Sequence, residues 1–309
     1  MVLLTFFSFC HTIIKSKNPF LRLWAGRFPS GGFGRSVSLG IDIGGSTTKI
    51  VGLREDKSIL GMQRVKAESP ITSLYGALGS FMTTYHLQLS DIKHIALTGV
   101  GASYVDGDIY GIPTVQVGEF TAVGTGGLAL SGQERAVVVS MGTGTAFIWA
   151  DSESGEMSHL GGSGVGGGTI AGLCKLLCGT NRVSLIRKLT GEGDINKIDL
   201  NVGDITKGGY STLAADITAA NFGNLSDDAN ASDLAVGVVN MVFQSIGTSS
   251  VFACRSKGCN TVVLTGYISI LEQCRPCFDL FTRLHGIEFI IPENAPYATC
   301  IGAALSSFQ

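Results

Sequence analysis

Short runs of β-branched and other apolar residues alternate along the chain with longer stretches of helical periodicity. In the first half, the pattern predicts a meander of three strands within residues 38–67, a helix over 70–87, a strand over 92–100 and a helix that begins near Glu119. Strands that alternate with helices are typical of α/β proteins. We therefore expect an α/β fold.

The second half opens in the same way as the first. Residues 136–150 predict a strand, a turn rich in glycine and threonine, and a second strand, as do residues 39–53. This similarity indicates an internal duplication at low identity. We therefore expect two domains, residues 39–135 and residues 136–309.

The remaining elements of the second half follow from the same periodicity. A helix should end at Gly179, because glycine readily adopts the left-handed conformation that closes a helix. A long apolar helix is expected over residues 231–255, with Ser232 as its N-cap. The other predicted elements are a strand over 261–269, a helix over 270–286, a strand over 287–293 and a short helix over 297–308.

Composition and charge exclude several classes of function. The 309 residues are enough to bury a sizeable core, and 45% of them are apolar. Only 15% are charged and the net charge is −2, so there is no charge imbalance that would favour nucleic acid or an anionic membrane. We expect a soluble globular protein that does not bind nucleic acid.

Eight cysteines are present, and we expect reduced thiols of a cytosolic-type compartment. A zinc site can be drawn from Cys254, Cys259, Cys274 and Cys277, but the first pair has the spacing C-x4-C and a predicted strand lies between the pairs. Packing as small apolar residues is the alternative interpretation of such cysteines.

Residues 1–38 form a basic leader without Asp or Glu. Its apolar run is too short to span a bilayer, and no membrane span is expected. The composition resembles a mitochondrial transit peptide, and a disordered extension or an upstream start is the alternative. A cytoplasmic location is expected, or a mitochondrial one if the leader is a targeting peptide.

The turn "DIGGSTTK" at residues 42–49 carries the first candidate chemistry. Successive backbone N–H groups of a glycine-rich turn, together with hydroxyls of Ser46, Thr47 and Thr48, can line an anion-binding concavity. A Walker loop is excluded because a strand, and not a helix, follows Lys49. An ordinary hairpin turn is the alternative for this segment on its own.

Three further glycine turns favour a nucleotide site. They are "GTGT" at 142–145, "GGG" at 166–168 at the start of a helix, and "LTG" at 264–266 at the end of a strand. Two phosphate-binding hairpins that face each other across a cleft would hold a nucleotide tail from both sides. Over residues 39–305 this set resembles the actin, hexokinase and Hsp70 superfamily, whose duplicated ribonuclease H-like domains close on ATP.

Within that superfamily, the chain is most similar to type II pantothenate kinases. The residues that carry the resemblance are "DIGGSTTKIV" (42–51), "VGEFTAVGTGG" (117–127), "MGTGTAF" (141–147), "GGSGVGGGTIAGL" (161–173), "DITAANFGN" (216–224) and "ENAPYATCIGAAL" (293–305). The resemblance implies ATP- and Mg²⁺-dependent phosphorylation of pantothenate, the first step toward coenzyme A. It also implies a homodimer, formed through the helix around residues 232–253.

The resemblance assigns roles to individual residues. Glu119 matches the catalytic base, Asp42 is the expected Mg²⁺ ligand, and Lys49 is the expected partner of β- or γ-phosphate oxygens. Substrate contacts are implied for Glu119, Thr143 and His159. Nucleotide contacts are implied for Asp42, Gly44, Gly45, Ser46, Thr47, Thr48, Lys49, Thr143, Gly144, Gly166, Gly167, Gly168, Thr169, Ile170, Gly266 and Tyr267.

Purely structural interpretations compete with these roles. Glu119 can be a helix-start carboxylate favoured by the helix dipole, and Asp42 can be a turn aspartate that bonds to its own backbone. In many sugar kinases of the superfamily the second hairpin carries another aspartate, whereas Ser140 lies in the equivalent region here. A metal site with two carboxylates is therefore not expected.

One residue departs from the family pattern. The family commonly has an arginine seven residues before the "GGG" turn, and this chain has His159 there. Arginine is a permanent forked cation, whereas histidine titrates near neutral pH. Other functions therefore stay open: an N-acetylglucosamine-type sugar kinase, an ATPase of the benzoyl-CoA-reductase or dehydratase-activator type, or an inactive ATP-binding scaffold.

Overall fold

The computed structural model describes residues 36–66, 69–206 and 214–308. The predicted targeting function of the leader falls on residues outside this description. The described chain forms two compact units: unit 1 holds residues up to 135 together with 149–158 and 292–308, and unit 2 holds 136–148 and 159–291. The division at residue 135 therefore holds for the first crossing only, since the chain returns twice to unit 1.

Unit 1 is built on a five-stranded sheet with the order β3-β2-β1-β4-β5. β1, β2 and β3 are antiparallel, as the predicted meander requires, and β4 and β5 run parallel to β1. The strands are β1 (Val37–Ile43), β2 (Thr47–Arg54), β3 (Ile59–Lys66), β4 (Ile92–Thr98) and β5 (Thr114–Gln116).

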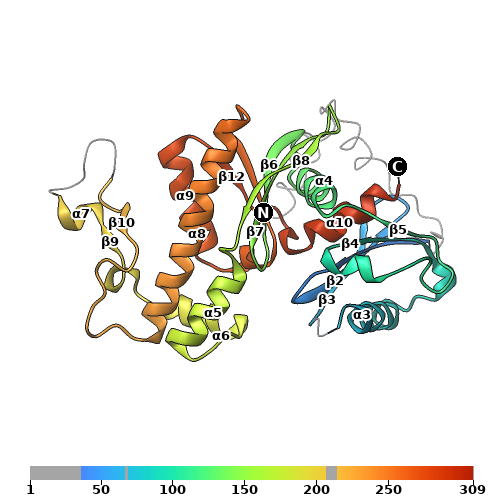
Figure 1. Cartoon of the computed structure of the whole chain (residues 1–309), viewed down its shortest axis with the longest axis horizontal. Helices are drawn as coiled ribbons and strands as arrows, with labels where there is room; N and C mark the ends of the chain where they lie inside the picture. Colours follow the sequence, from blue (N-terminus) through green and yellow to red (C-terminus); the bar gives the residue numbers. More distant parts are fainter. Residues whose placement is uncertain (1–35, 67–68, 207–213, 309) are drawn as a thin grey trace, which may run out of the picture. The chain divides into compact units, whose positions relative to one another are not determined.

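The two faces of this sheet are covered by different helices (Figure 1). Alternate residues of β1, from Leu39 to Ile43, share a core with α3 (Pro70–Thr84). The other face, on which Gly40 lies, packs against α10 (Ala298–Ser306), and a Cβ atom added at Gly40 would overlap the carbonyl oxygen of Cys300. Because side chains alternate along a strand, Asp42 also lies on the α10 face.

A second helix, α4 (Glu119–Ser131), crosses α10 at backbone contact distance. A Cβ atom added at Gly126 would overlap the carbonyl oxygen of Ala298, and one added at Gly302 would overlap that of Ala122. The crossing therefore requires glycine at both positions, which explains the glycine-rich character of both segments. It also fixes the position of Glu119, the first residue of α4, on the face of the sheet that carries Asp42.

Unit 2 contains most of a second five-stranded sheet, with the order β12-β11-β6-β7-β8. Read from the meander inward, both sheets have the same strand order, which confirms the predicted duplication. The third meander strand, β8, was not among the strands predicted from the sequence. The strands are β6 (Arg135–Met141), β7 (Thr145–Asp151), β8 (Met157–Ser163), β11 (Thr261–Thr265) and β12 (Glu288–Ile290).

The helices of unit 2 agree with most of the predicted boundaries. α5 ends at Gly179, which has a φ of 75° as expected for a left-handed cap. α9 begins at Cys274 and not at residue 270, because the chain first forms a 3-10 turn, η5, over Tyr267–Ile270. The helices are α5 (Gly167–Cys178), α6 (Val183–Glu192), α7 (Val202–Ile205), α8 (Ala231–Ser256) and α9 (Cys274–His285).

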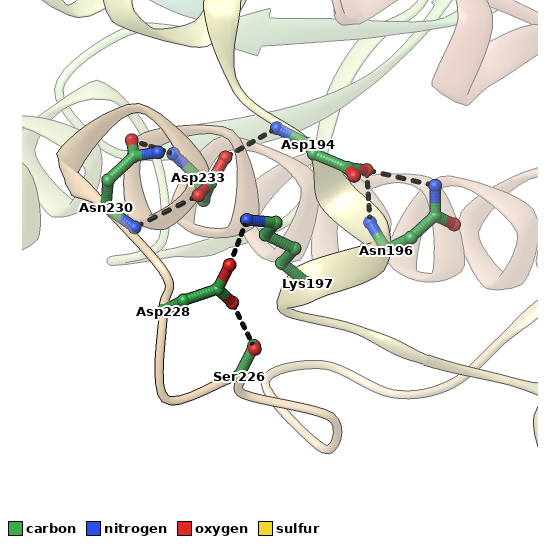
Figure 2. A network of polar contacts seen from close by, with 7 residues as sticks. All are labelled: Asp194, Asn196, Lys197, Ser226, Asp228, Asn230 and Asp233. Carbon is green, nitrogen blue, oxygen red and sulfur yellow. Dashed lines mark hydrogen bonds and ion pairs between the residues drawn. The ribbon is translucent and has the colours of Figure 1, made fainter.

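The N-cap of α8 is Asn230, so the prediction of Ser232 is wrong. Asn230 accepts hydrogen bonds from the backbone N–H groups of Ser232 and Asp233, and the Asp233 carboxylate accepts from the N–H groups of Asn230 and Asp194. Figure 2 shows this reciprocal cap beside the ion pair between Lys197 and Asp228. Asn230 is the N-cap because its side chain and the Asp233 carboxylate together accept hydrogen bonds from backbone N–H groups at the start of the helix, which have no partner within the helix.

Short elements complete the described chain. β9 (Leu200–Asn201) and β10 (Thr218–Ala220) form a two-stranded antiparallel sheet. In the described residues one helix, α8, is long and apolar enough to cross a membrane, and 61% of its most apolar window is buried inside the protein, as in a core helix. The other 3-10 turns are η2 (Leu89–Asp91), η3 (Val100–Tyr104), η4 (Ile195–Lys197) and η6 (Ala295–Tyr297).

Candidate functional site

An ion pair lies at the end of the central strand of unit 1. Asp42, near the end of β1, is the cross-strand partner of Lys49 on β2. Lys49 Nζ lies 3.2 Å from Asp42 Oδ2, and the two side chains are only 13% and 10% exposed. Strand pairing, and not sequence proximity, brings these charges together.

Glu119 lies within electrostatic reach of this pair. The protein around it desolvates the carboxylate of Glu119, and this desolvation, followed by the negative charge of Asp42, raises its pKa, while Lys49 acts in the opposite direction. Glu119 is nevertheless solvent-exposed at the first turn of α4. A carboxylate with a raised pKa is a stronger base than an ordinary one, and it is accessible to a ligand here.

Lys49 remains protonated despite its burial. Desolvation alone would lower the pKa of its ammonium group, but the charge of Asp42 and the hydrogen bond to it leave the pKa above its ordinary value. Burial raises the pKa of the Cys300 thiol, at the start of α10. The charges of Asp42 and Lys49 also act on this thiol, in opposite directions. The cluster thus consists of one cation, two carboxylates and a neutral thiol.

The turn between β1 and β2 is open to solvent. It is closed by a hydrogen bond from Gly44 N–H to the carbonyl oxygen of Thr47, with a donor–acceptor distance of 3.1 Å. Gly45 and Ser46 are exposed, and a Cβ atom added at Gly45 would meet no atom within 4 Å. Open space at this turn suits an incoming anion.

Thr48 does not contribute its hydroxyl to this turn. It is fully buried, and by the alternation of β2 it lies with Ile50 on the α3 face, opposite to Asp42 and Lys49. Its hydroxyl was expected to line the anion site, but it points to the opposite face of the sheet. Thr47 shares the face of Lys49.

Thr98 and Gly99 belong to the cluster, although the sequence analysis did not select them. Thr98, at the end of β4, pairs in register with Asp42, is fully buried, and its hydroxyl has no hydrogen-bond partner within the described residues. Gly99 has a φ of 85°, and a Cβ atom added there would lie 2.5 Å from Asp42 Oδ1. The signal was available, since "LTG" occurs at 97–99 as well as at 264–266.

The glycine turn of unit 2 packs against the start of α5. Gly167 N–H donates to the carbonyl oxygen of Gly142 at 2.9 Å, and Gly168 N–H donates to that of Thr143 at 2.8 Å. A Cβ atom added at Gly166 would lie 2.8 Å from Thr143 O. The "GGG" glycines were expected to let a nucleotide come close to the backbone. In the structure they let two backbone segments of the protein contact each other.

This packing leaves part of the turn accessible. Thr143 is exposed, and Gly144 and Thr169 are half-buried. The Thr169 hydroxyl donates to the carbonyl oxygen of Gly164 and accepts from Gly166 N–H, which holds the segment before α5 in place. Ile170, which we also selected, is buried.

Gly266 occupies in unit 2 the position that Gly99 occupies in unit 1. It follows Thr265 at the end of β11, has a φ of 91°, and a Cβ atom added there would overlap the backbone of Met141. The Thr265 hydroxyl donates to the carbonyl oxygen of Val139 at 3.1 Å. Tyr267 follows as the first residue of η5.

His159 lies on β8 and is exposed. A Cβ atom added at Gly162 would lie 3.6 Å from His159 Nε2 and 3.1 Å from the carbonyl oxygen of Thr145. The imidazole therefore folds along its own strand toward Gly162. Its exposed position makes it accessible to solvent.

The motif "DITAANFGN" surrounds a buried carboxylate. Asp199 is fully buried and accepts hydrogen bonds from Asn221 Nδ2 at 2.9 Å, from Phe222 N–H at 2.9 Å and from Asn240 Nδ2 at 2.7 Å. Asn240 lies on α8, so the motif attaches this loop to that helix. Asn221 of the motif thus has a structural role, through its side-chain hydrogen bond to Asp199.

A closed metal cage does not occur in the part of the chain that the structure describes, where no group of three or more His, Cys, Asp or Glu side chains could hold a metal ion. Mg²⁺ does not need such a cage, because it retains several waters and is usually bound by one or two carboxylates and substrate phosphates. The Asp42 carboxylate, the Mg²⁺ ligand expected from the sequence, could take part in binding of this kind.

Comparisons with known proteins agree with this geometry. The model of the family described as Fumble matches residues 136–274. The type II pantothenate kinase of Staphylococcus epidermidis is 28% identical over 277 residues, which cover 86% of this chain and 99% of the relative. The type II pantothenate kinase of Staphylococcus aureus is also 28% identical, and the match covers 98% of its length.

Solved structures support the fold. The activator of the 2-hydroxyisocaproyl-CoA dehydratase from Clostridium difficile, with bound ADPNP, is similar with a TM-score of 0.65 and 18% identity, over 88% of this chain and 94% of that one. A ROK family glucokinase from Streptomyces griseus gives a TM-score of 0.56 with 13% identity, over 88% and 99% of the two chains. The fold is thus that of the actin-like ATPases, and residues 136–274 match the model of the Fumble family.

Proposed function

We propose that this protein is a pantothenate kinase, which transfers the γ-phosphoryl group of ATP to the primary hydroxyl of pantothenate and so begins coenzyme A biosynthesis. The observation that carries the proposal is the cluster of Asp42, Lys49 and Glu119 on one face of the first sheet. It occurs in a chain that aligns with type II pantothenate kinases over 99% of their length.

Glu119 is the general base. It accepts the hydroxyl proton as the pantothenate oxygen attacks the γ-phosphorus, the bond from phosphorus to the β–γ bridging oxygen breaks, and ADP leaves. The raised pKa of Glu119 increases its proton affinity, and its solvent-accessible position at the start of α4 allows a substrate hydroxyl to approach. The rigid crossing of α4 and α10 holds the carboxylate in place.

Asp42 and Lys49 act on the phosphate groups. Lys49 stays protonated and offers its ammonium group to phosphate oxygens, while Asp42 would hold a hydrated Mg²⁺. When bound, Mg²⁺ neutralises the charge that develops on the transferring group. The open turn at Gly44–Ser46 offers backbone N–H groups to the same phosphates.

The family resemblance assigns further contacts to residues of unit 2: Thr143 and Gly144 to phosphate, Gly266 and Tyr267 to the nucleoside, and His159 to the substrate.

The assembly is a homodimer, an expectation that rests on the family resemblance. The exposed stripe of α8, formed by Ser245, Thr248 and Phe252, is the proposed contact surface, and Phe252 is 62% exposed. Light scattering after gel filtration should report twice the chain mass for the native protein and the chain mass for Phe252→Asp. A native protein that elutes with the mass of one chain would exclude this assembly.

The cellular location is proposed to be the cytoplasm, with the mitochondrion as the alternative. Only the basic leader of residues 1–38 bears on this choice. Imaging of a fluorescent protein fused behind residues 1–38 separates the two compartments.

A coupled ATP-consumption assay tests the function. We expect ATP turnover with pantothenate and only background turnover with pantetheine, N-acetylglucosamine or no acceptor. Product identity is checked by mass spectrometry, which should show pantothenate plus one phosphate. If N-acetylglucosamine is the only acceptor that supports ATP turnover, the chain is a sugar kinase. If ATP turnover is the same with and without an acceptor, the chain is an ATPase.

The activity of a Glu119→Gln variant distinguishes a kinase that uses Glu119 as its base from an inactive ATP-binding scaffold. Loss of a general base lowers the rate by about 10²- to 10⁴-fold. Glu134→Gln, at an exposed glutamate of unit 1, is the matched control and should retain full activity. Both variants should have the native circular dichroism spectrum. A Glu119→Gln enzyme as active as the control would remove Glu119 from the mechanism.

A further inference from the structure

The C-terminal end of α8 brings two cysteines together. Gly258 N–H donates to the carbonyl oxygen of Arg255, and Cys259 N–H donates to that of Cys254, at 3.2 and 3.0 Å. Gly258 has a φ of 60°. These are the two hydrogen bonds and the left-handed residue of a Schellman motif, in which the residue after the glycine contacts the residue five positions earlier. Here both residues of that contact are cysteines.

The two sulfur atoms share polar partners. Cys254 Sγ and Cys259 Sγ each lie 3.5 Å from the carbonyl oxygen of Thr261, and Thr261 N–H donates to Cys259 Sγ at 3.4 Å. Cys254 is fully buried, whereas Cys259 is partly exposed. Cys259 is therefore the more accessible residue of the pair, and the two sulfurs meet at the carbonyl oxygen of Thr261.

The surroundings divide the thiol chemistry between the two cysteines. The hydrogen bond from Cys254, followed by backbone N–H groups of Thr261, Val137 and Asn260, lowers the pKa of Cys259 to about 6, although burial opposes the shift. The same hydrogen bond and burial raise the pKa of Cys254. Cys259 therefore carries the more acidic thiol of the pair, and Cys254 the less acidic one.

Other cysteine pairs of unit 2 lack this arrangement. Cys174 and Cys178 lie one turn apart on α5, and burial raises the pKa of both thiols. Cys274 and Cys277, at the start of α9, are buried, and burial raises the pKa of each to about 12. These pairs provide internal controls with similar spacing and no stabilised thiolate.

We propose that Cys254 and Cys259 form a dithiol site that reacts with small-molecule disulfides and closes to an intramolecular disulfide. In the first step, Cys259 Sγ attacks one sulfur of the oxidant, whose disulfide bond breaks and releases one thiolate. In the second step, Cys254 loses its proton to solvent and its sulfur attacks Cys259 Sγ, which releases the second thiolate. Two protein thiols are oxidised and one disulfide is reduced.

The site is distinct from the kinase residues. Cys259 precedes β11, whereas Thr265 and Gly266 lie at the opposite end of that strand. The proposal therefore does not depend on the kinase function. Helix α8 ends and β11 begins at this site, so its oxidation would lock the connection between the two elements.

Differential alkylation tests the proposal on the full chain. The folded protein is treated with oxidised glutathione at pH 7, blocked with N-ethylmaleimide, digested and analysed by mass spectrometry. We expect a peptide pair joined through Cys254 and Cys259, with the loss of two hydrogen atoms. In Cys254→Ala the second step is impossible, so a glutathione adduct should persist on Cys259. In Cys178→Ala, the matched control, the disulfide should form as in the native protein.

A rate measurement on the native protein keeps the test independent of variants that fold poorly. At pH 6, iodoacetamide should modify Cys259 at least about tenfold faster than Cys178, because a larger thiolate fraction outweighs the lower nucleophilicity of an acidic thiol. Equal rates at the two cysteines, or oxidation spread evenly over the three pairs, would overturn the proposal.

Discussion

The two strand–turn–strand units share a backbone frame and differ in what the turns hold. In both, the first strand pairs with a strand that ends in Leu-Thr-Gly, and the glycine has a left-handed φ of 85° or 91°. In unit 1 the position opposite the threonine is Asp42, whereas in unit 2 it is Ser140. The first turn is open, and the second is packed against a helix.

This difference shows that the two copies of a duplicated fold can have different roles in one protein. The frame is preserved because the sharp turn after each Leu-Thr-Gly segment requires glycine in both copies. The charged groups of the proposed reaction lie in one copy only. The other copy contributes backbone geometry, and its glycines serve protein packing as well as access.

The largest expected effect comes from removing the charge at Asp42. Asp42→Asn should lower kcat by about 10²-fold or more, because it removes the carboxylate that would hold Mg²⁺ against the phosphate groups. Ser140→Ala, at the equivalent position of unit 2, should change kcat by less than about threefold. Steady-state kinetics at saturating ATP and pantothenate measure both. Equal losses would mean that the two copies share the chemistry.

The two left-handed glycines provide a second comparison. Gly266→Ala forces alanine into a strained conformation and against the backbone of Met141, so the free energy of unfolding should fall by about 1–3 kcal/mol or more. In Gly99→Ala the added Cβ atom would lie 2.5 Å from Asp42 Oδ1 and 2.8 Å from the carbonyl oxygen of Ile43, so a similar loss of stability should be accompanied by a loss of kcat.

Urea unfolding and kcat, measured on both variants, separate these outcomes. The comparison fails if Gly99→Ala loses stability without loss of kcat, because displacement of Asp42 would then be unimportant for the reaction.

The two turns should differ in their tolerance of a methyl group. Gly166→Ala places a Cβ atom 2.8 Å from Thr143 O and should lower the free energy of unfolding by about 1–3 kcal/mol. Gly45→Ala meets no atom within 4 Å and should change stability by less than about 0.5 kcal/mol. Thermal unfolding of both variants checks this. A strongly destabilised Gly45→Ala would show that the first turn is packed too.

The smallest expected effect is a displacement of the pH profile. A general base must be ionised, so kcat/KM rises with pH through the pKa of Glu119, which lies above the ordinary glutamate value. Lys49 lowers this pKa, and Lys49→Met should therefore move the acidic limb to higher pH. Lys93→Met, at an exposed lysine of the same unit, should leave the limb in place. A shift to lower pH would contradict the proposed cluster.

The sequence predicted the strands well and several boundaries less well. Strand alternation and the duplicated hairpin were sufficient for the two sheets, because burial of one or both faces imposes a regular pattern. The N-cap of α8 was misplaced because Asn230 and Ser232 are both good caps, and only the position of the Asp233 carboxylate and of the Asp194 N–H group decides between them. β8, "MSHLGGS", was not predicted because apolar and polar residues hardly alternate along it.

Site residues were predicted unevenly for a similar reason. Asp42, Lys49 and Glu119 were selected from motifs; strand pairing brings Asp42 and Lys49 together, and the crossing of α4 and α10 places Glu119 within electrostatic reach of them. Thr98 was missed, although the repeated "LTG" was visible, because a threonine at a strand end is unremarkable until its register with Asp42 is known. Thr48 was selected by its motif, but the pleat of β2 turns its hydroxyl to the other face.

The sequence by itself determined the fold class, the duplication and the resemblance to type II pantothenate kinases, because these depend on periodic patterns and on local motifs that neighbouring residues carry together. The tertiary structure alone decided which charges meet, which glycines are required by backbone contact, and that the cysteines of "CRSKGC" share polar partners at the end of a helix. Each of these depends on strand register, helix crossing or chain reversal, which set distances between atoms that the order of residues leaves open.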